Sequence, residues 1–342
     1  MDLAASGITL YSICRSYIRP GHDAPLPPLL QTARWAEDAG CRGSLIYSDC
    51  GSADAWLAAQ AAITGTAAFV PLIAVQPLDM TPFALARAVS SLAHLHGRGV
   101  DLNFVSGGFP RDLAAQGDSL AHDARYDRLT EYVTIVRMLL GGGLATYAGQ
   151  YYNIRRARLT APVPDGLLPT AYMSGSSAAS LQAGEALGIG QLSFPLPPGD
   201  FAGPDVRKNR FGSGISIGII ARDDSSEAWR IARKRFPADP EGSQRMRLLL
   251  SASVSSWQEQ LASVPIADEE EGQAYWLVPF RYHHTFCPYL VGNHDEVAQA
   301  VTTYLNGGIR TFVLDIPQEP DDLHHARIAI DRAVAAMDGG TS

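Results

Sequence analysis

The chain has 342 residues, of which 46% are hydrophobic and 18% charged, and its formal net charge is −8. This balance is typical of a globular protein with a sizeable core and argues against a disordered chain. With no cluster of Lys and Arg, no apolar run of about 18 residues and no signal-peptide pattern, the sequence excludes nucleic-acid and membrane partners and predicts a cytoplasmic protein.

Short β-rich segments alternate with helical segments from end to end, which is typical of a parallel sheet built from βα units. Eight strands are predicted, the number that closes a (β/α)8 TIM barrel, and such barrels commonly form one domain of about 250 residues or more. We therefore expect one α/β domain over residues 1–342. The predicted strands are Ile8–Cys14, Gly43–Asp49, Phe69–Val75, Val100–Ser106, Thr170–Ser174, Ile189–Phe194, Gly214–Arg222 and Arg310–Ile316.

Several helix boundaries carry clear signals. Thr81-Pro82 places a capping hydroxyl before a proline at the first helical position. Residues 124–141 repeat apolar side chains at spacings of three and four, so one face of this helix should pack on the barrel. Near the end of the chain, Asn306-Gly307-Gly308 ends another helix.

Two stretches interrupt the alternation, 143–169 and 238–288. The second contains a helical segment, QRMRLLLSASVSSWQEQLA, followed by the acidic ADEEEG. Insertions of this size in a barrel usually lie on the C-terminal face, over the site. We expect both stretches to form a lid there.

The segment Tyr172–Ser177, YMSGSS, ends one predicted strand and opens the predicted helix Ala178–Leu187. Its glycine permits a tight turn, after which free backbone N–H groups and two hydroxyls face one point. The partial positive charge of a helix N-terminus then favours a phosphate without any lysine. The same pattern is also a good helix N-cap, so the residues alone leave both interpretations open.

Polar residues follow the fourth predicted strand. Asn103 and Ser106 lie at its C-terminal end, where the catalytic and cofactor-binding groups of barrels are found. His122 opens the next helix, with Arg125 and Tyr126 in the same turn and Asp123 as an adequate cap. A satisfied buried amide at Asn103 and a surface or capping histidine at His122 are the alternatives.

The sequence motifs do not indicate a metal site or a serine hydrolase. The pairs His283-His284 and His324-His325 lack the H-x-x-x-H spacing of zinc helices, and no G-x-S-x-G follows a strand. We expect no metal site and no Ser-His-Asp hydrolase. The cysteines have no C-x-x-C spacing and should be reduced thiols; they are Cys14, Cys41, Cys50 and Cys287.

Three strings in chain order resemble the bacterial-luciferase-like flavin monooxygenases, and most of all their alkanesulfonate monooxygenase branch. They are LNFVSG at 102–107, H-x-x-RY at 122–126, and the run from GQYYNIRRARL to YMSGSS at 149–177. Further similar strings extend the resemblance over nearly the whole chain: DAW at 54–56, LIAVQP at 72–77, RDDSSEAW at 222–229, SQRM at 243–246 and LVGNHDEVAQAV at 290–301.

The resemblance implies a barrel that takes reduced FMN from a separate NAD(P)H:flavin reductase, uses it to activate O2, and forms a homodimer or homotetramer. The catalytic residues stay unassigned, with Ser52, His122 and His283 as candidates. Carried over by position, the cofactor-binding residues lie beneath the flavin ring (Ala74), beside it (Asn103, Ser106), in contact with the cofactor (His122, Tyr126) and around its phosphate (Gly175, Ser176, Ser177).

The chain departs from the alkanesulfonate enzymes where they contact the sulfonate. Ser216 and Gly218 replace their Arg and His, His283 their lid arginine, Pro317 or Gln318 their last-loop tyrosine, and Ser52 their barrel-mouth cysteine. A desolvated sulfonate needs charge-assisted donors, so we expect a different substrate. The candidates for another anion site, all equally compatible with ordinary loop positions, are Arg15, Arg19, Arg281, His283 and His284.

The leading hypothesis is a two-component FMNH2-dependent monooxygenase that oxygenates a small organic substrate at sulfur, nitrogen or an aldehyde-like carbon. One alternative is an F420-dependent oxidoreductase, in which the cofactor transfers hydride and O2 takes no part. The other is a flavin-binding protein of the same fold that has lost catalysis.

Overall fold

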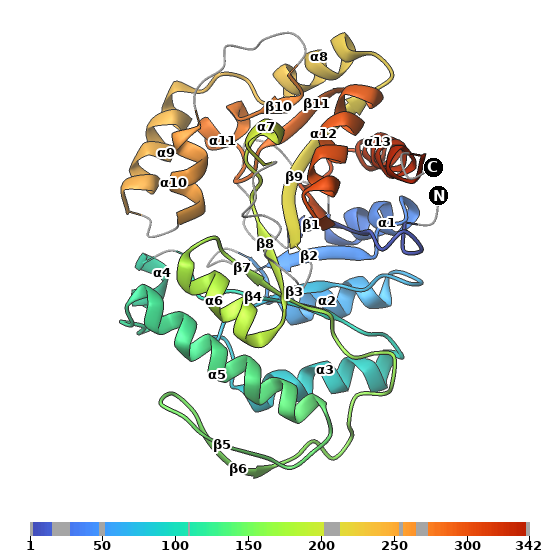
Figure 1. Ribbon diagram of the computed structural model, residues 1–342. Helices are drawn as coiled ribbons and strands as arrows, with labels where there is room; N and C mark the ends of the chain where they lie inside the picture. The colour runs from blue at the N-terminus through green and yellow to red at the C-terminus, as the bar shows by residue number, and fades with distance from the viewer. Residues whose placement is uncertain are drawn as a thin grey trace.

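The computed structural model describes residues 3–15, 28–47, 52–108, 110–201, 213–252, 256–264 and 273–339. Within these ranges eight parallel strands close into a barrel in the order β1-β2-β3-β4-β7-β8-β9-β12, and β12 pairs back with β1 (Figure 1). The predicted barrel is therefore confirmed. Its strands are β1 (Thr9–Arg15), β2 (Gly43–Tyr47), β3 (Leu72–Val75), β4 (Asp101–Phe104), β7 (Ala171–Ser174), β8 (Gly190–Ser193), β9 (Ser213–Arg222) and β12 (Ile309–Leu314).

Helices surround the barrel on the outside, and α12 and α13 pack closely on each other. The helices are α1 (Leu29–Asp38), α2 (Ala55–Thr64), α3 (Pro82–His96), α4 (Pro110–Ala115), α5 (His122–Leu140), α6 (Ala178–Leu187), α7 (Pro198–Phe201), α8 (Ser225–Arg235), α9 (Pro240–Ala252), α10 (Ser256–Ser263), α11 (Val278–Arg281), α12 (His294–Asn306) and α13 (Pro320–Gly339). The boundary signals read from the sequence are confirmed, since the Thr81 hydroxyl caps α3 and α12 ends at Asn306.

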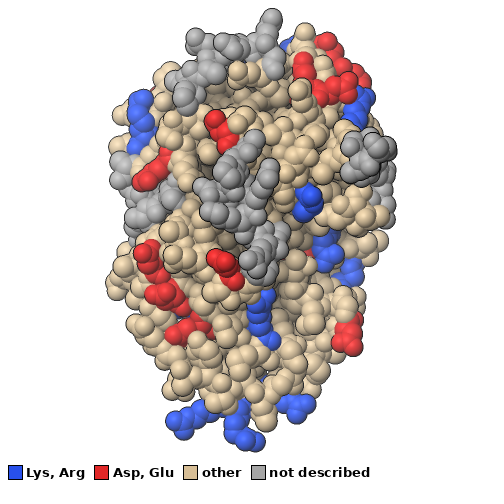
Figure 2. Space-filling model, viewed as in Figure 1, with Lys and Arg blue, Asp and Glu red and all other residues tan. Residues whose placement is uncertain are grey.

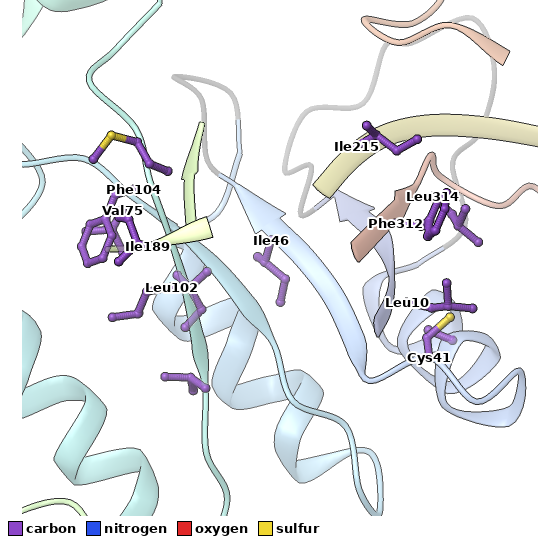
Figure 3. Close-up of a cluster of buried hydrophobic side chains, with 14 of the residues drawn as sticks. Leu10, Cys41, Ile46, Val75, Leu102, Phe104, Ile189, Ile215, Phe312 and Leu314 are labelled. Atoms are coloured by element: carbon purple, nitrogen blue, oxygen red, sulfur yellow. The ribbon is translucent and has the colours of Figure 1, made fainter. Parts of the chain in front are cut away.

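Barrel strands are buried on both faces, which explains their near-continuous apolar sequences. One face fills the barrel interior with Tyr11, Leu72, Tyr172 and Val313. The opposite face packs against the helices in the largest core cluster. Figure 3 shows part of that cluster, including Leu10, Ile46, Leu102 and Phe312 from four of the strands.

Asp101 joins several parts of the barrel at the start of β4. Its fully buried carboxylate accepts hydrogen bonds from the Tyr11 hydroxyl at 2.6 Å, from Arg42 Nε at 2.5 Å and from the Thr170 backbone N–H at 2.8 Å. These donors come from β1 and from the residues that precede β2 and β7. The carboxylate therefore links segments that are distant in the sequence.

The stretch 143–169 does not cover the C-terminal face, so the lid expectation was wrong for it. It forms a hairpin of β5 (Ala145–Ala148) and β6 (Asn153–Ala157) that lies beyond α5 in Figure 1. Glu131 of α5 accepts from the backbone N–H groups of residues 150–152, and the Tyr152 ring lies 5.8 Å from that of Tyr132. Ser90 of α3 donates to the Ala161 carbonyl. These partners hold the stretch on the outer helices.

The second insertion adds a small sheet and a helical layer beside the barrel. Strand β9 runs past the barrel, and its residues 218–222 pair with β11 (Tyr289–Asn293), which in turn pairs antiparallel with β10 (Tyr275–Trp276). The predicted helical segment contains α9 and α10, which share an apolar cluster with α11, and residues 253–255 between them lie outside the described residues.

Acidic and basic side chains are interspersed over the face shown in Figure 2. Basic side chains lie at the lower end of this view, where the β5–β6 hairpin is found in Figure 1; on β6, Arg155 and Arg156 are exposed. Among the helices that the structure describes, none combines the length and the apolar character needed to cross a membrane.

Candidate functional site

An open pocket of about 530 Å³ lies where β4 and β7 end and where α5 and α6 begin. This is the C-terminal side of the barrel, where barrel proteins carry their sites. The pocket is lined by Val105, Ser106, Gly107, Gly108, His122, Tyr126, Ser174, Gly175, Ser176, Ser177 and Trp257. Six of the residues predicted to bind cofactor are in this set.

The turn between β7 and α6 builds one wall of the pocket. Ser177 is the N-cap of α6, and its hydroxyl accepts a hydrogen bond from the Ser180 N–H at 3.2 Å. The side chain of Gln191 on β8 donates to the Gly175 carbonyl and to the Ser180 hydroxyl, at 2.6 and 2.7 Å. The turn is thus fixed from the barrel side, and the N-terminus of α6 opens on the pocket.

Gly175 is required by the geometry of this turn. Its φ is +135°, and a Cβ built on it would lie 2.6 Å from both the Ser180 Oγ and the Tyr126 hydroxyl oxygen. The Tyr126 hydroxyl also donates to the Ser174 carbonyl at 3.5 Å. Any side chain at this position would therefore displace the groups that line the pocket.

Asn103 and Ala74 lie deeper, next to the pocket and outside the lining set. Asn103 is 4% exposed, and its Oδ1 accepts a hydrogen bond from the Ser174 hydroxyl at 2.8 Å. Ala74 pairs in register with Asn103 across β3 and β4. Ser106 is buried and lines the pocket directly. Neighbouring barrel strands thus bring these predicted residues together, with Asn103 held as a hydrogen-bonded buried amide.

His122 is the first residue of α5 and faces the pocket beside Tyr126, with the two ring centroids 5.2 Å apart. Its Nδ1 lies 2.6 Å from a carboxylate oxygen of Asp123. The sequence interpretation of Asp123 as the helix cap is wrong, because Ala121 occupies that position without a side-chain bond. Asp123 instead pairs with the imidazole Nδ1, and the His122 side chain lines the pocket.

Arg125 supports the pocket from behind. It is 5% exposed and donates to the carbonyls of Leu120 at 3.0 Å and Gly107 at 3.4 Å. Burial lowers the pKa of this guanidinium. Nearby, Arg128 pairs with Asp118 at 2.6 Å. The loops that follow β4 are therefore fixed by two arginines on one face of α5.

Trp257 is a lining residue that sequence reasoning missed. It belongs to α10 in the second insertion, and its ring centroid lies 4.2 Å from that of Phe194. No sequence motif signals this contact, because it depends on how the insertion folds back over the barrel. The second insertion therefore does reach the site, as expected.

Two of the three catalytic candidates lie outside the lining set. Ser52 is found shortly before Asp54, the N-cap of α2. His283 has a φ of +58° and places its ring 5.7 Å from that of Phe286. Of the candidates, His122 alone lines the described pocket.

The alternative anion site is not assembled by the described residues. Arg281 donates to the Val264 carbonyl, and His284 Nε2 lies 2.8 Å from the Pro237 carbonyl oxygen. Neither lines the pocket. Arg19 and the side chain of Arg15 lie outside the described residues.

The sulfonate-contact positions have other surroundings here. The ring of Tyr289 fills the space at Gly218, 2.3 Å from where a Cβ would be, and its hydroxyl donates to Asp315 at 2.7 Å. Ser216 lies in β9, two residues before Gly218. Pro317 and Gln318 follow β12, and the Gln318 N–H bonds to Asp322.

Among the described residues no three His, Cys, Asp or Glu side chains group as a metal site would require. His325 pairs with His294 across α13 and α12, with Nδ1 and Nε2 2.9 Å apart. Cys14, Cys41 and Cys287 are free and buried, while Cys50 lies outside the described residues. Burial raises the pKa of the Cys41 thiol to about 12, so this thiol is unreactive.

The donor set suits a phosphate monoester. The N-terminus of α6, two serine hydroxyls and the His122 imidazole face the pocket, beside the Tyr126 hydroxyl that donates to the Ser174 carbonyl. No Asp or Glu is among the described lining residues. A helix N-terminus with free N–H groups binds phosphate well without a cation. Next to the pocket, β3 and β4 bring Ala74 and the buried Asn103 into register with each other.

Comparisons with known proteins give matches over most of the chain. The family model described as luciferase-like monooxygenase matches residues 11–311. A relative from Niallia circulans, the 4-(gamma-L-glutamylamino)butanoyl-[BtrI acyl-carrier protein] monooxygenase BtrO, is 30% identical over 305 residues, covering 87% of this chain and 89% of the relative.

Two solved structures share the fold. A riboflavin lyase, RcaE, solved with modified FMN and riboflavin, has a TM-score of 0.74 at 18% identity and covers 96% of this chain and 92% of its own. An F420-dependent secondary alcohol dehydrogenase has a TM-score of 0.66 at 15% identity, with coverages of 95% and 99%. Since the family model spans most of the sequence, the chain belongs to the luciferase-like monooxygenase family.

Proposed function

We propose that the protein is the oxygenase of a two-component system, which receives reduced FMN from a separate NAD(P)H:flavin reductase and oxygenates a small organic substrate with O2. The observation that carries this proposal is the cradle formed by Gly175, Ser176 and Ser177 at the N-terminus of α6, with Tyr126 and His122 beside it. When bound, reduced flavin supplies the electrons that activate O2.

The residues of the chain then bind, orient and exclude water. The α6 N-terminus and the serine hydroxyls hold the 5′-phosphate, while Asn103 and Ser106 lie beside the ring and Ala74 beneath it. His122, oriented by Asp123, donates from Nε2 or accepts a proton there. Trp257 brings an apolar surface to the pocket from the insertion, which favours a dry site. No protein nucleophile is needed for this chemistry.

We propose a substrate other than a simple alkanesulfonate. At the positions that correspond by sequence to the sulfonate contacts of the alkanesulfonate monooxygenases, this chain has Ser216 and Gly218, and the Tyr289 ring fills the space at Gly218. A desolvated sulfonate would need charge-assisted donors there. Nearness to the alkanesulfonate enzymes stays a prediction from motifs. The relative BtrO is named for an acyl group on a carrier protein, which makes acyl thioesters a substrate class to test.

The F420-dependent alternative draws support from a solved structure of the same fold. In that reading a reduced deazaflavin transfers hydride and O2 is not consumed. The non-catalytic alternative predicts flavin binding without substrate-dependent O2 uptake. His122 and Tyr126 are both present beside the cradle, as the resemblance to the flavin monooxygenases implies, and this favours an active enzyme over the non-catalytic alternative.

The test supplies reduced FMN enzymatically and offers isotopically labelled O2 with alkanesulfonates, thioethers, amines, aldehydes and acyl-pantetheine thioesters. We expect one class to give a product that carries the oxygen label, with little product from alkanesulfonates. Product formation from reduced F420 without O2 would overturn the proposal in favour of hydride transfer. Flavin binding with no labelled product from any class would support the non-catalytic reading instead.

A further inference from the structure

Trp257 differs in origin from every other described residue that lines the pocket. The others belong to the end of β7, to the loops after β4 and β7 or to the first turns of α5 and α6, all parts of the barrel itself. Trp257 comes from α10, in the insertion between β9 and β11. The pocket is therefore lined both by barrel segments that hold the polar groups and by one indole from the insertion.

The indole is firmly packed. Its ring centroid lies 4.2 Å from that of Phe194 at an interplanar angle of 34°, 6.3 Å from Phe280 and 6.4 Å from Phe286. Trp257 also packs on a buried cluster that includes Leu261 of its own helix. A ring held by aromatic neighbours on several sides does not move aside without loss of those contacts. The indole is therefore a fixed part of the pocket lining.

Charge limits the ligand in the same direction. A phosphate monoester ends at the cradle, whereas the phosphate of F420 is a diester with a tail of further carboxylates, and that of FAD is part of a diphosphate that leads to adenosine. The described lining residues include no Lys or Arg to meet the added carboxylates of F420. The buried guanidinium of Arg125 is engaged by the Leu120 and Gly107 carbonyls. Burial of unpaired anionic groups is costly.

We infer that Trp257 is a specificity-determining residue that restricts the site to flavins ending in a phosphate monoester and rejects those whose phosphate continues into a further tail. The inference rests on the proposed function, because it takes the cradle as the cofactor site. It deepens that function, since it selects reduced FMN over reduced F420 and reduced FAD by the shape and charge of the pocket.

The experiment compares anaerobic equilibrium titrations of the full-length protein with reduced FMN, FAD and F420, for the wild type and for Trp257→Ala and Trp257→Phe. We expect the wild type to bind FMN at least about tenfold more tightly than FAD or F420. Trp257→Ala should reduce this preference for FMN about tenfold, mainly because FAD and F420 bind more tightly, and Trp257→Phe should reduce it less.

Trp229→Ala is the matched control. Trp229 lies in α8, packs against Trp276 with ring centroids 5.6 Å apart, and does not line the pocket, so this variant should keep the wild-type ratio. Circular dichroism and thermal unfolding of each variant establish that it is folded. Should Trp257→Ala not fold, the ratio measured for Trp257→Phe decides.

An unchanged ratio in the folded Trp257 variants, or equal weakening of FMN and FAD, would overturn the inference and leave the proposed function standing, because FMN would still bind. Wild-type protein that binds F420 or FAD as tightly as FMN would also overturn it. If the wild type binds none of the three flavins, the inference and the proposed function fail together.

Discussion

Gly175 lines the pocket and lies between the Tyr126 hydroxyl and the Ser180 side chain. Its positive φ is one that residues with a Cβ rarely adopt, and the carbonyl of the same residue is held by Gln191. Three features of Gly175 thus oppose a larger side chain: its backbone conformation, the lack of space for a Cβ and its fixed carbonyl. A single methyl group at this position should therefore disturb the turn.

Gly175→Ala should weaken binding of reduced FMN by about tenfold or more, because the Cβ would push Tyr126 and Ser180 out of place. The measurement is an anaerobic titration together with thermal unfolding of the free protein. Gly143→Ala is the control, since a Cβ there meets no atom within 4 Å. Equal FMN affinities for the two variants would contradict the assignment of the cradle.

Ser177→Ala separates ligand binding from helix capping. The Ser177 hydroxyl caps α6, so its loss should reduce stability by about 1 kcal/mol and also weaken FMN binding. Thr81→Ala removes the equivalent cap from α3, away from the pocket, and should reduce stability by a similar amount without changing FMN affinity. If Ser177→Ala and Thr81→Ala lost stability and FMN affinity to the same extent, the loss of a helix cap alone would explain the effect of the Ser177 substitution.

Local chemistry made the Gly-Ser-Ser turn predictable, because a strand end, a glycine and a capping hydroxyl follow one another in the sequence. The roles of Trp257 and Gln191 were not predictable in this way. Each depends on a partner that is distant in the chain, Phe194 for the indole and Gly175 for the amide. Asp123 was misread because a good capping residue adjoins the true cap, Ala121.

At the scale of elements, α12 and α13 pack through a pair of imidazoles, of which His294 is buried and His325 half-buried. His294 is 2% exposed, and its ring stacks on that of His325 with centroids 5.1 Å apart. Burial, the partner imidazole and Arg332 lower the pKa of His294, against the opposing effects of Asp223 and Asp295. Burial and the positive charge of Arg222 also lower the pKa of His325, together with His324 and against Asp223 and Asp321.

This pair makes stability depend on pH with a definite sign. Both folded-state pKa values lie below the usual 6.5, so the unfolded chain binds protons more readily as pH falls. The contribution of the two imidazoles to stability is fully present above pH 6.5 and is lost as the pH falls below that value. Thermal unfolding over a pH series should show a falling Tm in this range, and His294→Gln should make the dependence shallower.

His96→Gln is the control for this experiment, because His96 belongs to α3 and lies away from the pair. It should leave the pH dependence as in the wild type. If His294→Gln and wild type gave parallel curves of Tm against pH, the imidazole pair would not be the source of the dependence.

Elements such as α5, which follow from the hydrophobic periodicity of their own sequence, were predictable. Elements whose position depends on contacts with distant parts of the chain were less so. The hairpin β5–β6 was expected over the site, yet Glu131 and Tyr132 of α5 hold it on the outer face of the molecule. Periodicity describes a segment by itself and does not state which helix will satisfy its backbone N–H groups. The extension of β9 beyond the barrel escaped prediction for a similar reason, since its second half needs β11 as a partner.

For the whole molecule, the alternation of strands and helices was enough to predict the closed barrel. Asp101 illustrates how closure is stabilised, because its buried carboxylate connects β4 with Tyr11, Arg42 and Thr170. Such a carboxylate leaves several donors unpaired when it is removed.

Asp101→Ala should therefore lower the free energy of unfolding by about 3 kcal/mol, measured by chemical denaturation. The exposed Asp127→Ala on α5 is the control and should change it by less than about 0.5 kcal/mol. A loss at Asp101 no larger than that at Asp127 would contradict the view that this carboxylate holds the barrel together.

The central claim is that the N-terminus of α6 holds the phosphate of reduced FMN. The most direct measurement is an anaerobic titration of the purified protein with reduced FMN and, in parallel, with reduced riboflavin, which has the same ring and no phosphate. The account predicts saturable binding of FMN at least about tenfold tighter than that of riboflavin, from the charge-assisted bonds to the phosphate. Equal affinities, or no binding of either flavin, would contradict it.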